Sequence, residues 1–182
     1  MKRVVICMLA LFCFSSIVYA QGTFDRPEYD PTKANGTPGQ DDDFLQNAMN
    51  QTSAEIEWSK IAAQKSTNPD VKALASETVD NETSAAQHEV SLARALSVKP
   101  PNGLSGKEKK ESDKLRTMSG PDFDKEYLTA LEKVEHLDLD NMQQEAQGTK
   151  RPELKNLAST NASRDATRNE KTKALRKQLT GK

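Results

Sequence analysis

Apolar residues recur at helical spacing in four long segments of this chain, which span about residues 41–65, 69–96, 121–148 and 152–180. Each segment opens on a residue type that starts helices: aspartate at Asp41, and proline at Pro69, Pro121 and Pro152. Strict alternation of apolar and polar residues never persists, so the pattern predicts no strand. The chain is therefore predicted to be all-α.

The connections between these segments are short, except for the one between the second and the third. There Pro100, Pro101 and Gly103 break the chain, and Ser105 opens a short, highly charged helix that runs through Met118. A mixed charge run of this kind is usually a solvated face, so we assign it no site. The arrangement predicts an up-down four-helix bundle with a short extra helix in the crossing segment between helices 2 and 3.

Ionisable residues interrupt the apolar face of every long helix near its midpoint, where a bundle core is expected to be hydrocarbon. Asp138 falls inside the apolar face of its helix, and Glu135 falls on the edge of the same face. Helices of similar length place their midpoints at similar depth, so these side chains are predicted to form one polar layer. This layer is the candidate binding site, and it consists of Glu55, Glu82, Glu135, Asp138, Asp165 and Arg168.

Two interpretations of the layer remain open. In the first, Arg168 forms charge-assisted hydrogen bonds with facing carboxylates, and the network fixes the register of the helices. In the second, Glu55, Glu82, Glu135 and Asp138 form an oxygen-only site for a divalent metal ion, beside which Arg168 would repel the cation.

The two histidines do not fit the Glu-x-x-His pairs of ferritin-like di-metal centres. Ala85 stands three residues before His88, and Lys133 stands three residues before His136. Both histidines also fall outside the apolar faces of their helices, so we expect them to be exposed. No cofactor is therefore expected, with the divalent ion kept as the alternative.

The N-terminal residues of the chain predict that the protein is exported. Lys2 and Arg3 precede an apolar run that ends in Val18-Tyr19-Ala20, so residues 1–20 are predicted to be a signal peptide. Residues 21–40 are rich in glycine and proline and form a predicted flexible leader before the bundle domain at 41–180. We expect a protein of the periplasm or cell envelope that does not span the membrane after signal cleavage.

Charge and motifs exclude several classes of function. The chain has 26 Lys and Arg and 27 Asp and Glu side chains, and removing Lys2 and Arg3 changes the formal net charge from −1 to −3, so no nucleic-acid partner is indicated. No phosphate loop, nucleophile elbow or paired-cysteine motif appears, which argues against an enzyme. A binding module for an envelope protein or cell-wall component remains, with basic residues in its last turns (Lys171, Lys173, Arg176 and Lys177).

A set of short motifs recurs in a fixed order over about residues 43–175. They are Phe44-Leu45, Ala54-Glu55-Ile56-Glu57, Lys60-Ile61-Ala62, Asn68-Pro69-Asp70-Val71-Lys72, Val79-Asp80, Phe123-Asp124, Tyr127, Glu145-Ala146, Gly148, Pro152-Glu153-Leu154-Lys155 and Leu157-Ala158. In these motifs the chain resembles a family of exported, ferritin-like domains of unknown function that are often labelled putative outer membrane proteins. The resemblance implies a ferritin-like bundle. Where that family typically has histidines, this chain has Glu82, Glu135 and Arg168, so the resemblance does not extend to metal ligands.

Overall fold

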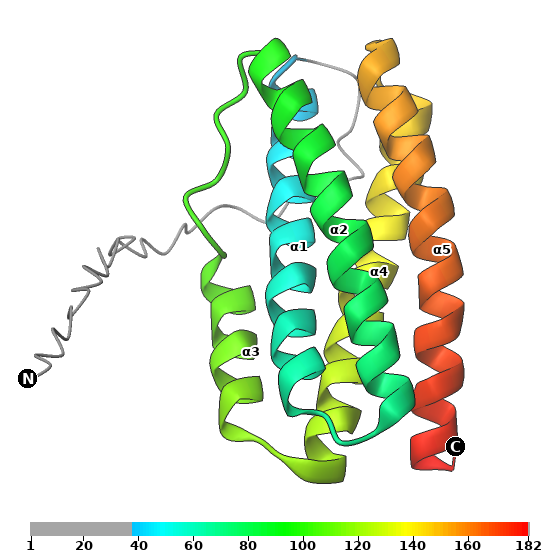
Figure 1. The fold of residues 1–182 in the computed structure, drawn as a ribbon. Helices are drawn as coiled ribbons and strands as arrows, with labels where there is room; N and C mark the ends of the chain where they lie inside the picture. The colour runs from blue at the N-terminus through cyan, green and yellow to red at the C-terminus, as the bar shows by residue number, and fades with distance from the viewer. Residues whose placement is uncertain (1–37, 182) are drawn as a thin grey trace, which may run out of the picture.

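The computed structural model describes residues 38–181, and this part of the chain folds into five helices without a strand (Figure 1). The predicted all-α helical bundle is confirmed. The predicted signal peptide and all but the last three residues of the predicted leader lie outside the described residues. The helices are α1 (Pro38–Lys65), α2 (Pro69–Ala95), α3 (Gly106–Thr117), α4 (Gly120–Gly148) and α5 (Pro152–Thr180).

The first helix begins at Pro38, inside the predicted leader and three residues before the predicted start at Asp41. Asp41 lies in its first turn, but its carboxylate is buried against the turn between α4 and α5. There Thr149 donates a hydrogen bond to it at 3.2 Å, and the Nε of Arg151 lies 3.1 Å from it. This contact fixes the start of α1 to the opposite pair of helices.

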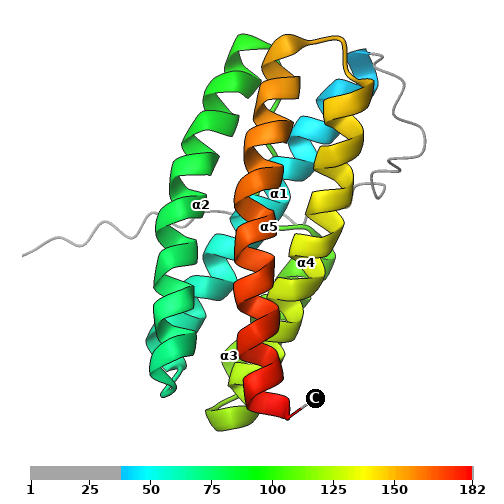
Figure 2. The ribbon, with the colours of Figure 1, turned by 90° about the vertical axis from the view of Figure 1, so that its right-hand side faces the viewer.

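The four long helices stand side by side, and α1 packs mainly on α2 and α4, while α5 packs mainly on α4 and α2 (Figures 1 and 2). The chain runs down α1, up α2, back down through the segment that contains α3, up α4 and down α5. Packed neighbours are therefore antiparallel, and the parallel pairs lie on the diagonals. This is the single-crossover topology of ferritin-like bundles.

The short helix α3 is anchored to the outside of α1 despite its highly charged sequence. The indole Nε1 of Trp58 donates to the backbone oxygen of Glu108 at 3.2 Å and to the hydroxyl of Ser112 at 3.0 Å, and Leu115 is fully buried. Ser105 occupies the N-cap position, but its side chain makes no capping hydrogen bond. The charged helix therefore has one buried edge, and only its remaining surface is a solvated face.

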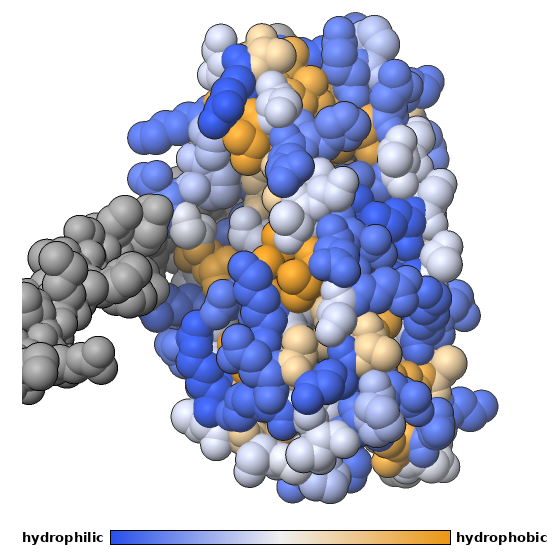
Figure 3. Space-filling model, viewed as in Figure 1, coloured by the Kyte–Doolittle hydropathy of each residue, from blue (hydrophilic) through white to orange (hydrophobic). Residues whose placement is uncertain are grey.

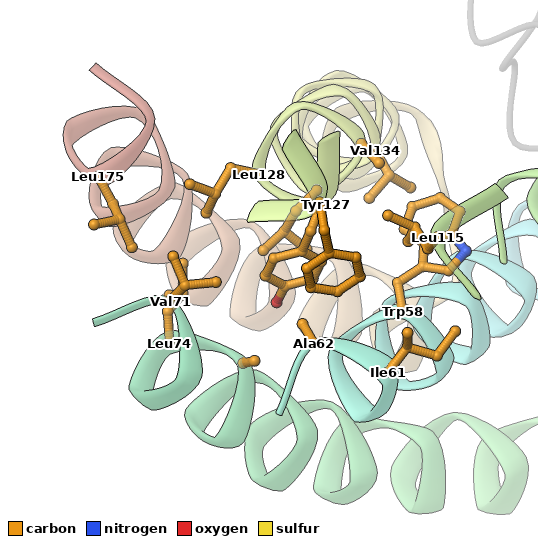
Figure 4. Packing of buried hydrophobic residues seen from close by; sticks show 14 of the residues in the cluster. Trp58, Ile61, Ala62, Val71, Leu74, Leu115, Tyr127, Leu128, Val134 and Leu175 are labelled. Atoms are coloured by element: carbon orange, nitrogen blue, oxygen red, sulfur yellow. The ribbon is translucent and has the colours of Figure 1, made fainter. Parts of the chain in front are cut away.

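The apolar core is divided into two clusters along the bundle. The lower cluster lies near the turn between α1 and α2, and Figure 4 shows Trp58 and Leu115 packed beside Tyr127 there. The upper cluster lies near the turn between α4 and α5 and includes Phe44 and Met142. Buried charged residues separate the two clusters, so the hydrophobic effect holds the ends of the bundle, and its middle depends on polar contacts.

The surface of the bundle is mainly polar. The face in Figure 3 is mostly hydrophilic, with several small, separate apolar areas, one of them over the upper end of α2. Among the described residues, Leu137 is the one large hydrophobic side chain that is exposed. No helix between residues 38 and 181 combines the length and the apolar character that crossing a bilayer requires.

Candidate functional site

A layer of buried polar side chains crosses the middle of the bundle, with contributions from all four long helices. All six predicted residues lie in it, and each is at most 5% exposed. Glu55 belongs to α1, Glu82 to α2, Glu135 and Asp138 to α4, and Asp165 and Arg168 to α5. The structure thus brings the predicted residues to one depth between the two apolar clusters.

The guanidinium of Arg168 is the centre of this layer. Its Nε donates to Glu135 at 2.6 Å, one terminal nitrogen donates to Glu55 at 2.6 Å, and the other donates to Glu82. The Oδ1 of Asp165, one turn earlier on the same helix, lies 3.2 Å from the nitrogen that serves Glu55. A single side chain of α5 therefore binds carboxylates on α1, α2 and α4.

A second arginine, Arg164, extends the network by one turn of α5. Its Nε donates to Asp165 at 3.1 Å, and its terminal nitrogens donate to Asn161 at 3.1 Å and to Glu82 at 3.3 Å. Its side chain is 23% exposed, so it connects the layer with the surface. The Glu82 carboxylate consequently bridges both arginines.

Glu135 also receives hydrogen bonds from neutral side chains. Asn169 donates to its Oε2 at 3.2 Å, and Thr172 donates to its Oε1 at 3.3 Å. Together with Arg168, these contacts occupy both oxygens of the carboxylate. Glu135 is therefore the most completely bonded acid of the layer.

Other acids of the layer have fewer hydrogen-bond donors than Glu135. Glu89 of α2 accepts from Thr52 at 3.0 Å and from Asn161 at 3.2 Å, both at the same oxygen, and its second oxygen has no partner among the described residues. One oxygen each of Glu55, Asp138 and Asp165 is likewise buried without a partner in the described part of the chain. A buried oxygen without a hydrogen-bond donor is costly, because it has lost its contact with water.

The pKa values of these carboxyls rise because the groups are buried. Desolvation, partly offset by Arg168, raises the pKa of Glu135 to about 7, and desolvation, partly offset by the Thr52 hydrogen bond, raises that of Glu89 to about 8. Burial also raises the pKa of Asp138 well above its usual value, and the neighbouring charges of Asp165 and Glu89 raise it further. Burial therefore makes these carboxyls bind protons more readily than solvated ones do.

Arg168 stays charged in the same environment. Burial alone would lower the pKa of its guanidinium, but the carboxylates of Glu55, Glu82, Asp165 and Glu135 raise it well above the usual value. The layer contains six acids, including Glu89, and two arginines, so the arginines balance only part of the negative charge that the layer would carry with every carboxyl ionised.

Glu135 is predicted on the edge of the α4 apolar face and as a member of the polar layer. The structure buries it fully, with its carboxylate bound to Arg168 of α5. His88 and His136 are exposed, as predicted. Sequence reasoning did not place Glu89 and Arg164 in the layer, although Glu89 follows Glu82 by seven residues and Arg164 precedes Arg168 by four, spacings that share a helix face.

The carboxylates of the layer surround a guanidinium. Glu55, Glu82 and Glu135, three of the four ligands of the predicted metal alternative, each accept a hydrogen bond from Arg168. Within residues 38–181, no three His, Cys, Asp or Glu side chains are arranged so that they could hold a metal ion. The donor set therefore fits a divalent ion poorly in this geometry.

Comparison with known proteins places the chain in a family. A family model described as a domain of unknown function, DUF4142, matches residues 27–175. The chain belongs to the DUF4142 family. The predicted resemblance to a domain of unknown function is thereby confirmed, but this match gives no support to the outer-membrane label. No curated protein matches this DUF4142 protein.

A solved structure supports the fold of the DUF4142 domain. The crystal structure of a DUF305 fragment from Deinococcus radiodurans is similar to it with a TM-score of 0.70 and 13% sequence identity. The similarity covers 79% of this chain and 98% of the DUF305 chain. At this identity the match shows a shared helical fold alone.

Proposed function

We propose that this DUF4142 protein is an exported, non-enzymatic binding or structural module of the cell envelope, and that its polar layer is a structural ion network. The observation that carries the proposal is the position of Arg168. Its guanidinium binds Glu55, Glu82 and Glu135, which come from the three other long helices. In this view the arginine occupies the place that metal ions hold in di-metal carboxylate bundles.

Such a network fixes the alignment of the helices more than it adds to the stability of the fold. Desolvating charged groups is costly, so a buried ion pair seldom adds much net stability over apolar packing. It does penalise any sliding or rotation of a helix that separates the partners, because a stranded charge costs several kcal/mol, on the order of 3–5. One arginine that bonds to three helices therefore selects a single alignment of the bundle.

The alternative function is binding of a divalent metal ion by Glu55, Glu82, Glu135 and Asp138. The buried oxygens of Glu55 and Asp138 that lack partners among the described residues favour it. Arg168 disfavours it, because a fixed positive charge among the ligands repels a cation.

The two proposed functions predict different metal contents and different effects of added metal on the melting temperature. We expect the purified, dialysed protein to contain no stoichiometric iron, manganese or calcium by elemental analysis. Its melting temperature should remain unchanged when these ions or a chelator are added, because the site is already filled by a side chain. Stoichiometric metal that stabilises the protein, with destabilisation by the chelator, would instead establish the alternative.

Export is tested on the full chain expressed in a bacterium. We expect the protein to be recovered outside the cytoplasm with Gln21 as its first residue, since the predicted cleavage site follows Ala20. The variant Leu11→Arg places a charge in the apolar run and should retain the protein in the cytoplasm with its first 20 residues still attached. Cytoplasmic, uncleaved wild-type protein would contradict the envelope assignment.

A further inference from the structure

An open groove of about 460 Å³ lies on the outer surface of α4 and α5, away from the polar layer. Every residue that lines it is polar or charged, so the groove has no apolar side chain to hold a hydrophobic ligand. Four of the six can carry a positive charge, and one is acidic. The lining residues are Thr129, Glu132, Lys133 and His136 from α4, and Lys173 and Arg176 from α5.

The basic residues form two matched pairs. Lys133 and His136 are three residues apart on α4, and Lys173 and Arg176 are three residues apart on α5, a spacing that puts each pair on one face of its helix. The two helices lie side by side along their length (Figure 2). Two rigid helices thus present four basic side chains to the same space.

The one acid of the groove is already engaged. Glu132 accepts hydrogen bonds from Nε and one terminal nitrogen of Arg176, which fixes the guanidinium in the groove and leaves its other terminal nitrogen without a partner among the described residues. The carboxylate therefore orients Arg176 and offers little attraction to a further cation.

The lysines have little to hold them. Lys173 contacts Glu170 at 3.3 Å, but both side chains are largely solvated, at 46% and 79% exposed, and such pairs are weak. Lys133 and His136 are exposed, and the charge of Lys133 also acts on Glu111 of α3, where it opposes the rise in pKa that burial causes. Both lysines can turn toward a ligand at small cost.

The charge of the groove selects an anion. Lys133, Lys173 and Arg176 against Glu132 leave a net charge of about +2 on the groove, whereas the whole chain has a formal net charge of −1. We propose that this groove is a binding site for a phosphate group. Phosphate matches the two net charges, and its oxygens suit arginine and lysine donors that are presented together.

The phosphate can belong to a free inorganic anion or to the headgroup of an anionic phospholipid. Both sources share the recognised chemistry, and the experiment separates them. This site goes beyond the proposed function, because it uses surface residues and does not depend on Arg168. A result that contradicts the metal-free or the export assignment would therefore not contradict the proposed phosphate site.

The test compares the protein with two double variants of equal charge change. Lys133→Gln with Lys173→Gln removes both lysines of the groove. Lys60→Gln with Lys155→Gln removes two exposed lysines that do not line it. Titration calorimetry with pyrophosphate measures free-anion binding, and co-sedimentation with phosphatidylglycerol vesicles, against phosphatidylcholine vesicles, measures headgroup binding. Circular dichroism confirms that all the proteins are folded.

We expect the wild type and the Lys60/Lys155 variant to bind pyrophosphate, phosphatidylglycerol vesicles or both. The groove variant should bind roughly 25-fold more weakly, since each basic residue contributes roughly fivefold near an anionic group. Binding of pyrophosphate identifies the free anion as a ligand, and binding of vesicles alone identifies the headgroup. The proposal is overturned if the wild type binds neither, or if the two double variants weaken binding equally.

Discussion

At the scale of single residues, the identity of Arg168 matters as much as its charge. A guanidinium presents five N–H donors in a rigid fork, and here its Nε and both terminal nitrogens serve different carboxylates. A lysine ammonium in the same place is a compact point charge on a flexible stem and cannot reproduce three fixed directions. The contacts with α1, α2 and α4 therefore depend on arginine.

Replacing this side chain should strongly destabilise the protein. The variant Arg168→Met keeps much of the volume and removes the charge, which takes the arginine partner from Glu55 and Glu135 and leaves Glu82 with Arg164 alone. We expect it to lower the free energy of unfolding by about 3–5 kcal/mol in urea denaturation at pH 7. Arg168→Lys should lose less, because the charge remains.

The matched control is Lys60→Met, at an exposed position of α1. A surface substitution of this kind should change the free energy of unfolding by less than about 0.5 kcal/mol. If Arg168→Met is as mild as this control, Arg168 does not hold the layer together.

At the scale of elements, the end of α2 shows a local conflict between sequence and backbone. Ser97 follows the helix with φ of 60°, in the left-handed region that favours glycine. Its amide N–H donates to Arg94 at 3.2 Å, and that of Val98 donates to Ala93 at 2.8 Å, which is the Schellman pattern of helix ends. The helix thus ends in a common motif, with a serine at the position where glycine is favoured.

The variant Ser97→Gly should relieve this strain. We expect it to raise the free energy of unfolding by about 0.5–1 kcal/mol, because glycine adopts positive φ without steric cost. Thermal denaturation followed by circular dichroism measures the effect, and an unchanged or lower melting temperature would contradict it.

The opposite exchange provides a second test of the same principle at the start of α4. Gly120 has φ of +66°, and a Cβ there would meet no atom within 4 Å. Gly120→Ala should therefore cost about 1 kcal/mol through backbone strain alone. A neutral result would show that this turn relaxes without cost.

Local chemistry explains how far the elements could be predicted. Pro69 opens α2, as the sequence predicts, and Asn68 caps the helix by accepting from the amides of Asp70 and Val71. The start of α1 was placed at Asp41 because the acidic run looked like a cap, but helix geometry begins at Pro38. The buried edge of α3 depends on Trp58, a distant residue in sequence, and no local pattern reveals it.

The individual contacts within the layer could be predicted from the sequence less well than the helices. Helical spacing placed the charged residues on inward faces, which is enough to bring Glu55, Glu82 and Arg168 to one depth. Which oxygen bonds to which nitrogen depends on the rotation and offset of each helix, and the packing of four elements sets these. Hence Glu89 and Arg164, one or two turns from the expected midpoint, were not placed in the layer.

At the scale of the whole molecule, the layer links stability with pH. The pKa of Glu135 is raised to about 7 and that of Glu89 to about 8 in the folded protein, mainly because burial disfavours their charged forms. The folded state therefore binds these protons more tightly than the unfolded state. Their contribution to stability is fully present below the unfolded pKa, near 4.5, and is lost as pH rises through the folded values.

The melting temperature should consequently fall as the pH is raised from 5 to about 8.5, across the window that these pKa values define. Glu89→Gln removes one of the titrating groups while keeping its size and an acceptor for Thr52 and Asn161. This variant should lose less stability than the wild type over the same range. Identical slopes for the two proteins would contradict the raised pKa of Glu89.

The central claim is that Arg168 locks the bundle by direct contact with the buried acids, and a double-mutant cycle tests it most directly. The cycle measures unfolding free energies of the wild type, Arg168→Met, Glu135→Gln and the double variant at pH 7. Direct contact predicts that the two substitutions are non-additive, with an interaction energy of about 1–3 kcal/mol. Additive effects, within about 0.3–0.5 kcal/mol, would show that the two side chains act independently and would contradict the claim.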